Sequence, residues 1–540
     1  MQFVTQLSAM CAVNRREFVR RTAGATLLVS APHIWISDAE AAQRAKNLGL
    51  DKRGFRNLAD VALGTAKKLG ASYADMRVCR YLHEGLHARE ERVESVSSSV
   101  NSGFGVRAIV DGTWGFASSN RVTKEQVEST TRLAVEMARA NHMIRKQSVE
   151  IEKLPGYDDD WVMPMKRDPF DVPVEDKVTL LLGINAAAQK AGANFCSSSL
   201  TFVREEKFFA SSYGALLRQV RVRSYPRFRV TVVDKATGRF DTRNSFAAPR
   251  GSGYEYVEEC RLTEEAVRAS EEAKEKQKAR SVEPGKKDLV LHPTNLWLTI
   301  HESVGHPTEL DRALGFEANF AGTSFVTPDK LGRLRYGSEL VNIVGDRTQK
   351  GGLSTIAYDD DGVKTKGAEF HILRNGHFEN YQMAVGIAQR IGRKRSNGCA
   401  FADSWDKFPI QRMPNISLQP GKKRVSVEDL FADIKDGIYI MGDSSFSIDQ
   451  QRYNFQFTGQ VFWEIKNGKR GQMLRDVAYQ GNTVDFWNSC DGLCGKDEYH
   501  LGGAMNCGKG QPQQIAPVSH GAVPARFRQV NVLNTERKDI

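Results

Sequence analysis

Residues 288–310 read DLVLHPTNLWLTIHESVGHPTEL, a short apolar run followed by a longer segment in which apolar residues return at helical spacing. Pro293 suits the first turn of a helix, and leucine, isoleucine and valine then recur every four residues from 296 to 304. The stretch therefore predicts a buried strand that leads directly into a buried helix starting between Pro293 and Asn295. His301 falls in the third turn of that helix.

The motif HESVGH in this helix separates His301 and His306 by five residues. In a regular α-helix five residues turn the chain by about 500°, so the two imidazoles would point about 140° apart. Both can face one ion only if a π-type or broken turn, which we expect centred on Val304 to Pro307, interrupts the helix. Gly305 has no Cβ to clash there, and Pro307 cannot donate a backbone hydrogen bond. Taken alone, the motif is equally compatible with two core histidines whose polar groups are satisfied by hydrogen bonds.

A second motif, HEGLH at 83–87, matches the short zinc-protease signature in which two histidines bracket a glutamate. That spacing stacks two imidazoles on one face only when the segment is a helix. The preceding residues 74–78 alternate apolar and charged, which is the period of a strand, and Gly85 would cost a helix about 1 kcal/mol. We therefore expect His83 and His87 to be surface residues of a strand-turn segment.

The order of expected helices and strands along the rest of the chain indicates two domains and predicts the α+β class. Residues 50–280 are expected to form an N-terminal α+β domain, and residues 286–540 a mostly antiparallel β domain that carries the HESVGH helix. The boundary follows a very polar helix and lies in SVEPGKKD at 281–288. The expected elements of the first domain are helices at 55–69, 178–191 and 263–280, a helix capped by Thr123 with Gln126 three residues on, and a tight hairpin at Asp111–Gly112.

The composition is that of an ordinary soluble globular protein. The chain has 540 residues, of which 40% are hydrophobic and 26% charged, enough for two or more domains with sizeable cores. Its formal charge is +11, but most Lys and Arg residues are interspersed with Asp and Glu, and the short basic runs lack interleaved aromatics. We therefore do not expect nucleic acid as a partner.

The N-terminal stretch NRREFVRRTAGATLLVSAP at 14–32 is similar to a twin-arginine export signal. Its apolar run is too short to span a membrane, which takes about 20 apolar residues. We expect a signal peptide over residues 1–41, a periplasmic or otherwise exported protein, and no permanent membrane anchor; the alternative is a basic tail without a signal. Of the cysteines beyond the signal, Cys490 and Cys494 are the nearest potential disulfide pair.

Together, HESVGHPTELD at 301–311 and NCGKGQ at 506–511 resemble the TldD/PmbA family of zinc metalloproteases. Further segments that look like the family cover nearly the whole chain after the signal: GYDDDWVMP at 156–164, RDPFDVP at 167–173, FFASSYG at 208–214, RMPNISL at 412–418 and GIYIMGDSSFSIDQQRYNFQF at 437–457. The resemblance implies a zinc ion held by His301, His306 and Cys507, with Glu302 acting on the metal-bound water. Family members of the other type lack the HExxxH residues and serve as partners, so this chain is similar to the catalytic type.

Two neutral imidazoles and a thiolate leave one position of a tetrahedral zinc ion open for water, which is the arrangement of catalytic zinc. Zinc lowers the pKa of that water to about 7, so a carboxylate such as Glu302 is basic enough to take its proton. Cys507 is favoured over Cys494, the other cysteine followed by Gly-Lys, because only Cys507 continues as GKGQ. Glu309 and Asp311 are candidates to orient a ligand imidazole, and they are equally compatible with ordinary surface carboxylates.

The function expected from these residues is that of a zinc-dependent peptidase. Its substrates would be short or unfolded peptides, held as an added strand against a sheet edge. The resemblance further implies a dimer that encloses the site, formed by two copies of this chain or with a TldE-like relative. The alternative function is a non-catalytic binding or assembly subunit of such a complex, whose metal is structural or absent.

Overall fold

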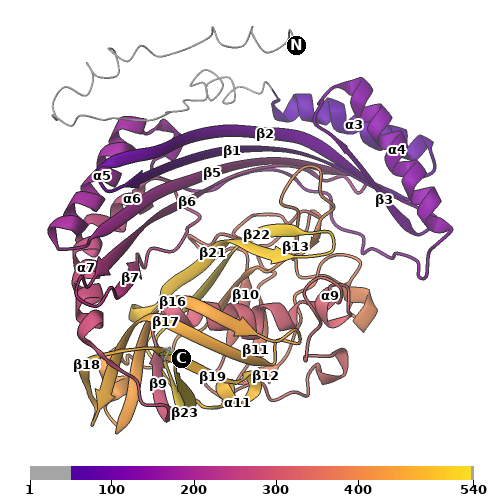
Figure 1. The fold of residues 1–540 in the computed structure, drawn as a ribbon. Helices are drawn as coiled ribbons and strands as arrows, with labels where there is room; N and C mark the ends of the chain where they lie inside the picture. Colours follow the sequence, from indigo (N-terminus) through magenta and orange to yellow (C-terminus); the bar gives the residue numbers. More distant parts are fainter. Residues whose placement is uncertain (1–49, 537–540) are drawn as a thin grey trace, which may run out of the picture.

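The computed structural model describes residues 50–536, in which two halves of the chain lie one over the other (Figure 1). The N-terminal half is a broad curved sheet with helices at both ends, and the C-terminal half lies on its concave side. The expected signal peptide, residues 1–41, lies outside the described residues. Within the described range, no helix combines the length and the apolar character that a membrane crossing requires.

Seven strands of the described chain build the N-terminal sheet, in the order β3-β2-β1-β5-β6-β4, with β7 paired to β6. They are β1 Tyr73–Arg89, β2 Arg92–Val110, β3 Thr113–Ser119, β4 Asp158–Val162, β5 Phe195–Ser211, β6 Leu216–Val233 and β7 Phe240–Asn244. Neighbouring strands are antiparallel except for β4 and β6, which are parallel. Because β2 alone contains 19 residues, the sheet is long enough to arch over the C-terminal half.

Helices lie at the two ends of this sheet, and all except the short helix Glu255–Glu259 match helices that the sequence predicts. They are α3 Lys52–Lys68 and α4 Lys124–His142 at one end, and α5 Val174–Lys190, α6 Glu255–Glu259 and α7 Leu262–Lys278 at the other. Thr123 caps α4 by accepting a hydrogen bond from the Gln126 backbone N–H, as predicted, but the Gln126 side chain donates to Thr130 instead of completing the capping box. Asp111 and Gly112 have φ of 48° and 72°, which confirms the predicted primed turn between β2 and β3.

His83 and His87 lie inside β1, between β2 on one side and β5 on the other. The prediction that HEGLH is on a strand rather than a helix is confirmed. The expected turn within it is wrong, because both neighbouring strands pair with β1 along its length and the strand continues to Arg89. Four residues of strand separate the two histidines by about 13 Å, and the His87 Nδ1 lies 2.8 Å from the Glu94 carboxylate.

Replacing both His83 and His87 by alanine should leave the metal content unchanged and should not abolish hydrolysis, because a strand holds the two imidazoles too far apart to share an ion. Because both side chains are partly exposed, the two substitutions should change the free energy of unfolding by only about 0.5 kcal/mol. Metal analysis and a peptide-cleavage assay on the purified double variant check this. Loss of the metal would move the site to β1.

The C-terminal half is built on a sheet of eight described strands, ordered β16-β9-β23-β19-β17-β18-β8, with β20 paired to β23. They are β8 Arg280–Ser281, β9 Gly285–Leu291, β16 Asp436–Ile448, β17 Asn454–Lys466, β18 Lys469–Arg475, β19 Val477–Asn482, β20 Cys490–Leu493 and β23 Ala525–Asn534. Only the β8–β18 and β9–β16 pairs in this sheet are parallel. The predicted α+β class with a mainly antiparallel C-terminal domain is confirmed.

Smaller elements surround this sheet. The strands β10 Ile343–Asp346, β11 Phe370–Arg374, β12 His377–Phe378 and β15 Asn415–Leu418 form one sheet; β13 Ala400–Phe401 pairs with β14 Ile410–Gln411, and β21 His500–Lys509 pairs with β22 Gln514–Ala522. The helices are α8 Pro293–Ile300, α9 Leu310–Ala313, α10 Val427–Phe431 and α11 Thr483–Asn488. The predicted helix start is confirmed, because α8 begins at Pro293 and packs against β16, β21 and β22.

Buried ion pairs join the two halves. Arg107 of β2 lies 2.7 Å from Asp75 of β1 and 2.8 Å from Asp361 of a C-terminal loop. Lys207 of β5 lies 2.8 Å from Asp360 in the same loop. Because removing one partner of a buried pair costs about 3–5 kcal/mol, these contacts fix the concave side of the N-terminal sheet over the C-terminal half.

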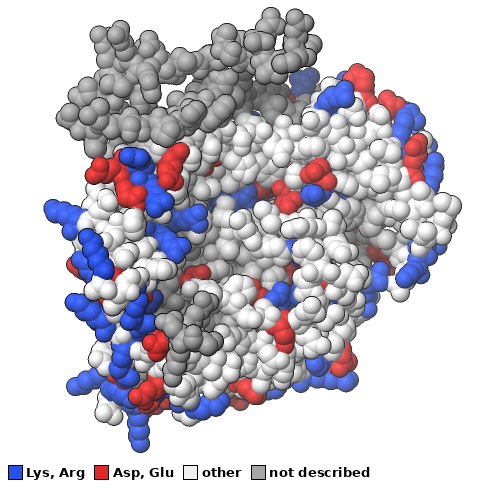
Figure 2. All heavy atoms as spheres, viewed as in Figure 1, with Lys and Arg blue, Asp and Glu red and all other residues white. Residues whose placement is uncertain are grey.

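Exposed charges of both signs lie mainly toward the edges of the face drawn in Figure 2, whose centre is largely uncharged. Lys and Arg side chains are densest along its left and lower edges, where Asp and Glu side chains lie among them. The exposed ion pairs show the same mixing, since Arg526 and Arg528 share the carboxylates of Asp433 and Asp491. Pairs of this kind contribute only about 0–1 kcal/mol each, so they do not determine the fold.

Candidate metal centre

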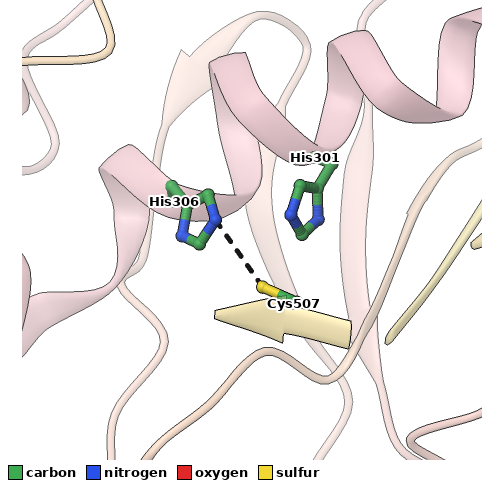
Figure 3. A group of neighbouring side chains, drawn as sticks. All are labelled: His301, His306 and Cys507. Carbon is green, nitrogen blue, oxygen red and sulfur yellow. Dashed lines mark hydrogen bonds between the residues drawn. The ribbon is translucent and has the colours of Figure 1, made fainter. Parts of the chain in front are cut away.

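The helix α8 does not continue as a regular α-helix into the HESVGH motif. A π-helical turn spans His301–Gly305, and a 3-10 turn over His306–Thr308 follows it directly. The predicted break in the helix is confirmed, although it begins at His301, before the stretch Val304 to Pro307 on which it was expected to be centred. Because of this break, the two imidazoles project from the same side of the helix toward the strand that carries Cys507 (Figure 3).

Packing and side-chain hydrogen bonds hold the irregular turn in place. A Cβ on Gly305 would lie 2.8 Å from the Met413 Sδ, so the glycine also allows a close approach between the turn and its neighbour. The Thr308 hydroxyl donates to the Val304 carbonyl at 2.7 Å. Such a bond satisfies a carbonyl that the interrupted helical ladder would otherwise leave without a donor.

His301, His306 and Cys507 each bring one potential ligand atom to the same point, with all three atoms within 4.8 Å of one another. The two imidazole centroids are 4.7 Å apart, and the Cys507 Sγ lies 3.6 Å from the His306 Nε2. The three side chains are only 6%, 4% and 4% exposed. Since Cys507 belongs to β21, 201 residues after His306, the site joins the α8 helix to the β21–β22 hairpin.

Cys494, the other cysteine followed by Gly-Lys, lies apart from this group. It follows β20, and its backbone N–H donates to the Pro524 carbonyl at 3.0 Å. The suggested disulfide between Cys490 and Cys494 is not formed, because all seven cysteines of the described chain are free thiols. The fold therefore places Cys507, and not Cys494, beside the two histidines.

Hydrogen bonds determine which nitrogen of each histidine faces the site. The His306 Nδ1 lies 2.9 Å from the Glu309 Oε2, a carboxylate oxygen that can only accept, so this nitrogen carries the proton. The His301 Nδ1 lies 2.7 Å from the His520 Nε2, and the His520 Nδ1 lies 3.1 Å from the Ile416 carbonyl oxygen. Because that carbonyl needs a donor, a neutral His520 accepts at Nε2 from His301. Both Nε2 lone pairs of the motif are thereby left for a metal.

Burial keeps these groups uncharged. It lowers the pKa of His301 and His306 well below the usual value, and that of His520 to about 3. Burial also raises the pKa of the Cys507 thiol to about 12, against the opposing effect of nearby Arg412. Two neutral imidazoles with free lone pairs, and a thiol that becomes a thiolate on binding, form a donor set that suits Zn²⁺. The residues therefore fit the metal that the motif implies.

Zinc uptake at about pH 5.5, where a zinc-bound water with a pKa of about 7 keeps both of its protons, should release one proton per ion. The two histidines are already neutral, whereas the Cys507 thiol must lose its proton to bind. The apparent affinity for zinc should consequently rise about tenfold for each pH unit. Calorimetric titration of the metal-free protein in buffers of different ionisation enthalpy counts the protons. No release would exclude the thiolate as a ligand, and release of two would mean that a histidine was charged.

A buried group of charges supports His306 from the other side. The Lys509 ammonium, 0% exposed, lies 3.0 Å from Glu309 and 2.7 Å from Asp311. Glu309 thus connects Lys509 to the His306 imidazole, whereas Asp311 contacts Lys509 instead of a histidine. Lys509 is the lysine of the CGKGQ motif, and its part in this network is a contact that the sequence alone did not reveal.

His520 is also absent from the sequence-based set of site residues. It lies on β22, 219 residues after His301, and no motif spacing connects the two. Its position in the hairpin directly after CGKGQ is the one signal that points to it, and such a signal is weak. His520 nevertheless holds the His301 ring, so it belongs to the site.

Replacing His520 by phenylalanine should weaken zinc binding about 10- to 100-fold, as loss of a hydrogen-bond partner to a metal ligand does elsewhere. A ring of similar size remains, but the acceptor for the His301 Nδ1–H is gone. Competition with a chromophoric chelator measures the affinity. His500→Phe, on the neighbouring strand β21, is the matched control and should bind zinc as the parent does. Parental affinity in His520→Phe would show that His301 is oriented by other contacts.

Glu302 lies in the π-helical turn next to His301 and is 5% exposed. Its Oε2 accepts a hydrogen bond from the Arg452 Nη1 at 2.9 Å. Burial raises the pKa of the Glu302 carboxyl, and the positive charges of Arg452 and Arg312 oppose that rise. Glu302 is thus more basic than an exposed glutamate, and the ion pair favours its charged form.

Comparison with protein-family models identifies three matching regions. The models describe PmbA/TldA metallopeptidases: domain 1 matches residues 74–138, the central domain residues 167–278 and the C-terminal domain residues 284–532. A metalloprotease of Methanocaldococcus jannaschii is 28% identical over 83% of this chain and 97% of its own. A zinc metalloprotease TldD homolog of Saccharolobus solfataricus is 25% identical over 79% of this chain and 89% of its own.

Solved structures with the same fold span nearly the whole described chain. TldE from Thermococcus kodakarensis superimposes with a TM-score of 0.63 at 17% identity, over 88% of this chain and 99% of that one. A Thermotoga maritima protein, described as a candidate modulator of a DNA gyrase, gives a TM-score of 0.67 at 17% identity, over 89% of this chain and all of that one (100%). At such identities these likenesses show the fold.

Proposed function

Because the chain belongs to the PmbA/TldD family of metallopeptidases, we propose that it is a zinc-dependent peptidase that cleaves short or unfolded peptides. The observation that carries this proposal is the convergence of His301, His306 and Cys507 on one point, next to the buried Glu302. When bound, zinc supplies Lewis acidity, which polarises a carbonyl and lowers the pKa of a coordinated water. The description of the S. solfataricus relative as a zinc metalloprotease supports this choice of metal.

Glu302 is the group that moves the proton. Arg452 holds its Oε2, which leaves Oε1 to accept a proton from the attacking water and to pass it to the departing amine nitrogen. The raised pKa of Glu302 makes it a stronger base, and burial by the π-helical turn restricts access of bulk water. General acid–base catalysis of this kind contributes about 10²–10⁴-fold to a rate.

A cleft of about 510 Å³, lined in part by β21, the strand that carries Cys507, supports an extended peptide as the substrate. Its lining includes Gly502–Asn506 of β21, the residues that lead up to Cys507. It also includes Ser197–Ser199 of β5 and Arg227 of β6. In the described chain β21 pairs with β22 alone, and an added peptide strand would pair along its other edge before Cys507. Main-chain pairing would accept many sequences but would require an unfolded substrate.

The assembly proposed for the protein is a dimer, formed by two copies of this chain or with a TldE-like relative. The likeness of this fold to TldE from T. kodakarensis supports an assembly of the TldD/TldE type. We place the enzyme in the periplasm or outside the cell, because the twin-arginine pattern in residues 1–41 supports export. Folding before export would allow zinc to be bound in the cytoplasm.

Removal and return of the metal test the proposed function. The purified protein is stripped with a chelator, and a library of fluorogenic peptides is assayed before stripping, after stripping and after addition of one equivalent of zinc. Hydrolysis that disappears and returns with the metal supports the peptidase. Zinc bound at one equivalent without cleavage of any peptide, alone or with a co-expressed relative, would favour the alternative, a non-catalytic assembly subunit.

A further inference from the structure

Three buried or half-buried arginines surround the metal centre, and they differ in how their N–H groups are used. Arg312 donates from all three of its nitrogens to main-chain carbonyls and to Glu317. Arg412 gives both of its Nη groups to the main chain of the β21–β22 hairpin and is 1% exposed. Both side chains are therefore committed to holding the protein together.

Arg452 is the exception. Among its contacts with the described residues, only the Nη1 group donates, to Glu302, so that the Nη2 group is left free, whereas both Nη groups of Arg412 are used. Its side chain is 15% exposed, against 0% for Arg312, so a molecule entering the site can reach it. Because Glu302 directly follows His301 in the chain, the bond to Glu302 places the Arg452 guanidinium beside the metal centre.

The backbone around Arg452 is braced in an unusual conformation. Its φ is 64°, in the left-handed region that a residue with a long side chain rarely adopts. The Asp449 carboxylate accepts from the backbone N–H groups of Tyr453 and Asn454, and the Thr483 hydroxyl donates to the Arg452 carbonyl at 2.9 Å. A strained residue that several contacts hold in place, with a donor left unpaired, is typical of a functional position.

We propose that Arg452 is a second catalytic residue, whose free Nη2 group binds the carbonyl oxygen of the scissile peptide bond and stabilises the negative charge that develops on it. This inference rests on the proposed peptidase function and adds a residue to it. A guanidinium fixed at the place where charge develops costs no reorganisation during the reaction, and such donors are among the largest single contributions to catalysis.

The step can be written with every atom accounted for. The water oxygen bonds to the carbonyl carbon, the π electron pair moves to the carbonyl oxygen beside Arg452, and Glu302 takes the proton of the water. The C–N bond then breaks while the C=O bond re-forms, and the amine nitrogen takes the proton from Glu302. The products are a carboxylic acid and an amine. Arg452 keeps its charge throughout, since an arginine does not lose its proton.

The experiment compares the zinc-loaded parent protein with R452A and R452K, and with R374A as the matched control. Arg374 forms an exposed ion pair with Glu379 on β11, outside the site. R452A should bind zinc as the parent does and lose about 10²–10³-fold in kcat, with KM nearly unchanged. R452K should recover only part of the loss, and added guanidinium ion should restore activity to R452A. R374A should match the parent.

A second measurement separates direct contact from an effect through Glu302. The probe is a phosphinic peptide, in which a tetrahedral phosphinate replaces the scissile amide. Its affinity should fall in R452A by about as much as kcat, and it should fall equally when R452A is made in an E302Q background. An R452A protein that keeps its kcat, loses its zinc, or binds the phosphinic peptide as tightly as the parent would overturn the proposal. If the parent cleaves no peptide, the proposed peptidase function is wrong. The affinity of R452A for the phosphinic peptide then still shows whether Arg452 binds the oxygen of a tetrahedral group at the site.

Discussion

Replacement of Glu302 by glutamine is expected to lower kcat for peptide hydrolysis by about 10²–10⁴-fold while zinc remains bound. Glutamine has nearly the same shape and keeps an oxygen that can accept from the Arg452 Nη1, so the π-helical turn and the two histidines should stay in place. What disappears is the one group in the site that can accept a proton from the attacking water. Steady-state kinetics and metal analysis of the same preparation measure both effects.

The control for this variant is Glu379→Gln, which removes an exposed carboxylate whose partner is Arg374. It should hydrolyse peptides at the parental rate. Parental kcat in Glu302→Gln would show that Glu302 is not the base. Loss of zinc in the same variant would show that the carboxylate is a structural part of the metal site, and the division of roles proposed for these residues would be wrong.

Replacement of Cys507 by alanine is expected to weaken zinc binding by more than about 100-fold, because loss of a hydrogen-bond partner to a ligand alone reduces affinity about 10- to 100-fold. Two imidazoles would remain, and the site would lose its one anionic donor. The proton released on zinc uptake should disappear with the thiol. Chelator competition measures the affinity, and peptide hydrolysis should fall in parallel as the metal is lost.

Cys494→Ala is the matched control, because Cys494 is also buried, is also followed by Gly-Lys, and lies outside the group of potential ligands. It removes one thiol and should keep the zinc affinity of the parent. The opposite result, with zinc retained in Cys507→Ala and lost in Cys494→Ala, would mean that the cysteine beside the two histidines is not a ligand.

The break at the end of the α8 helix could be predicted from the spacing of His301 and His306. A spacing of five positions from His301 to His306 is incompatible with one face of an α-helix, and Gly305 and Pro307 favour a departure from it. The structure has that departure, as a π-helical turn and a 3-10 turn. Local patterns of this kind can be read from a sequence because all the atoms involved lie within two or three turns of the chain.

The residues that complete the site could not be predicted in the same way. Arg452 and Glu302 are 150 residues apart, and His520 and His301 are 219 residues apart, so their contacts depend on how β16, β21 and β22 pack around α8. The error at HEGLH has the same origin. A turn was expected after Leu82, but pairing with β2 and β5 extends the strand to Arg89. In β1, pairing with distant strands outweighs the local propensity for a turn.

X-ray absorption at the zinc K edge of the zinc-loaded protein tests the central claim most directly, because it reports the atoms bound to the metal. The ligand set His301, His306 and Cys507 predicts two nitrogen atoms at about 2.0–2.1 Å, one sulfur atom at about 2.3 Å and a light atom in the remaining position. The sulfur contribution should vanish in any zinc that Cys507→Ala still binds. A shell of nitrogen and oxygen alone in the parent protein, or a shell with two or more sulfur atoms, would contradict this account.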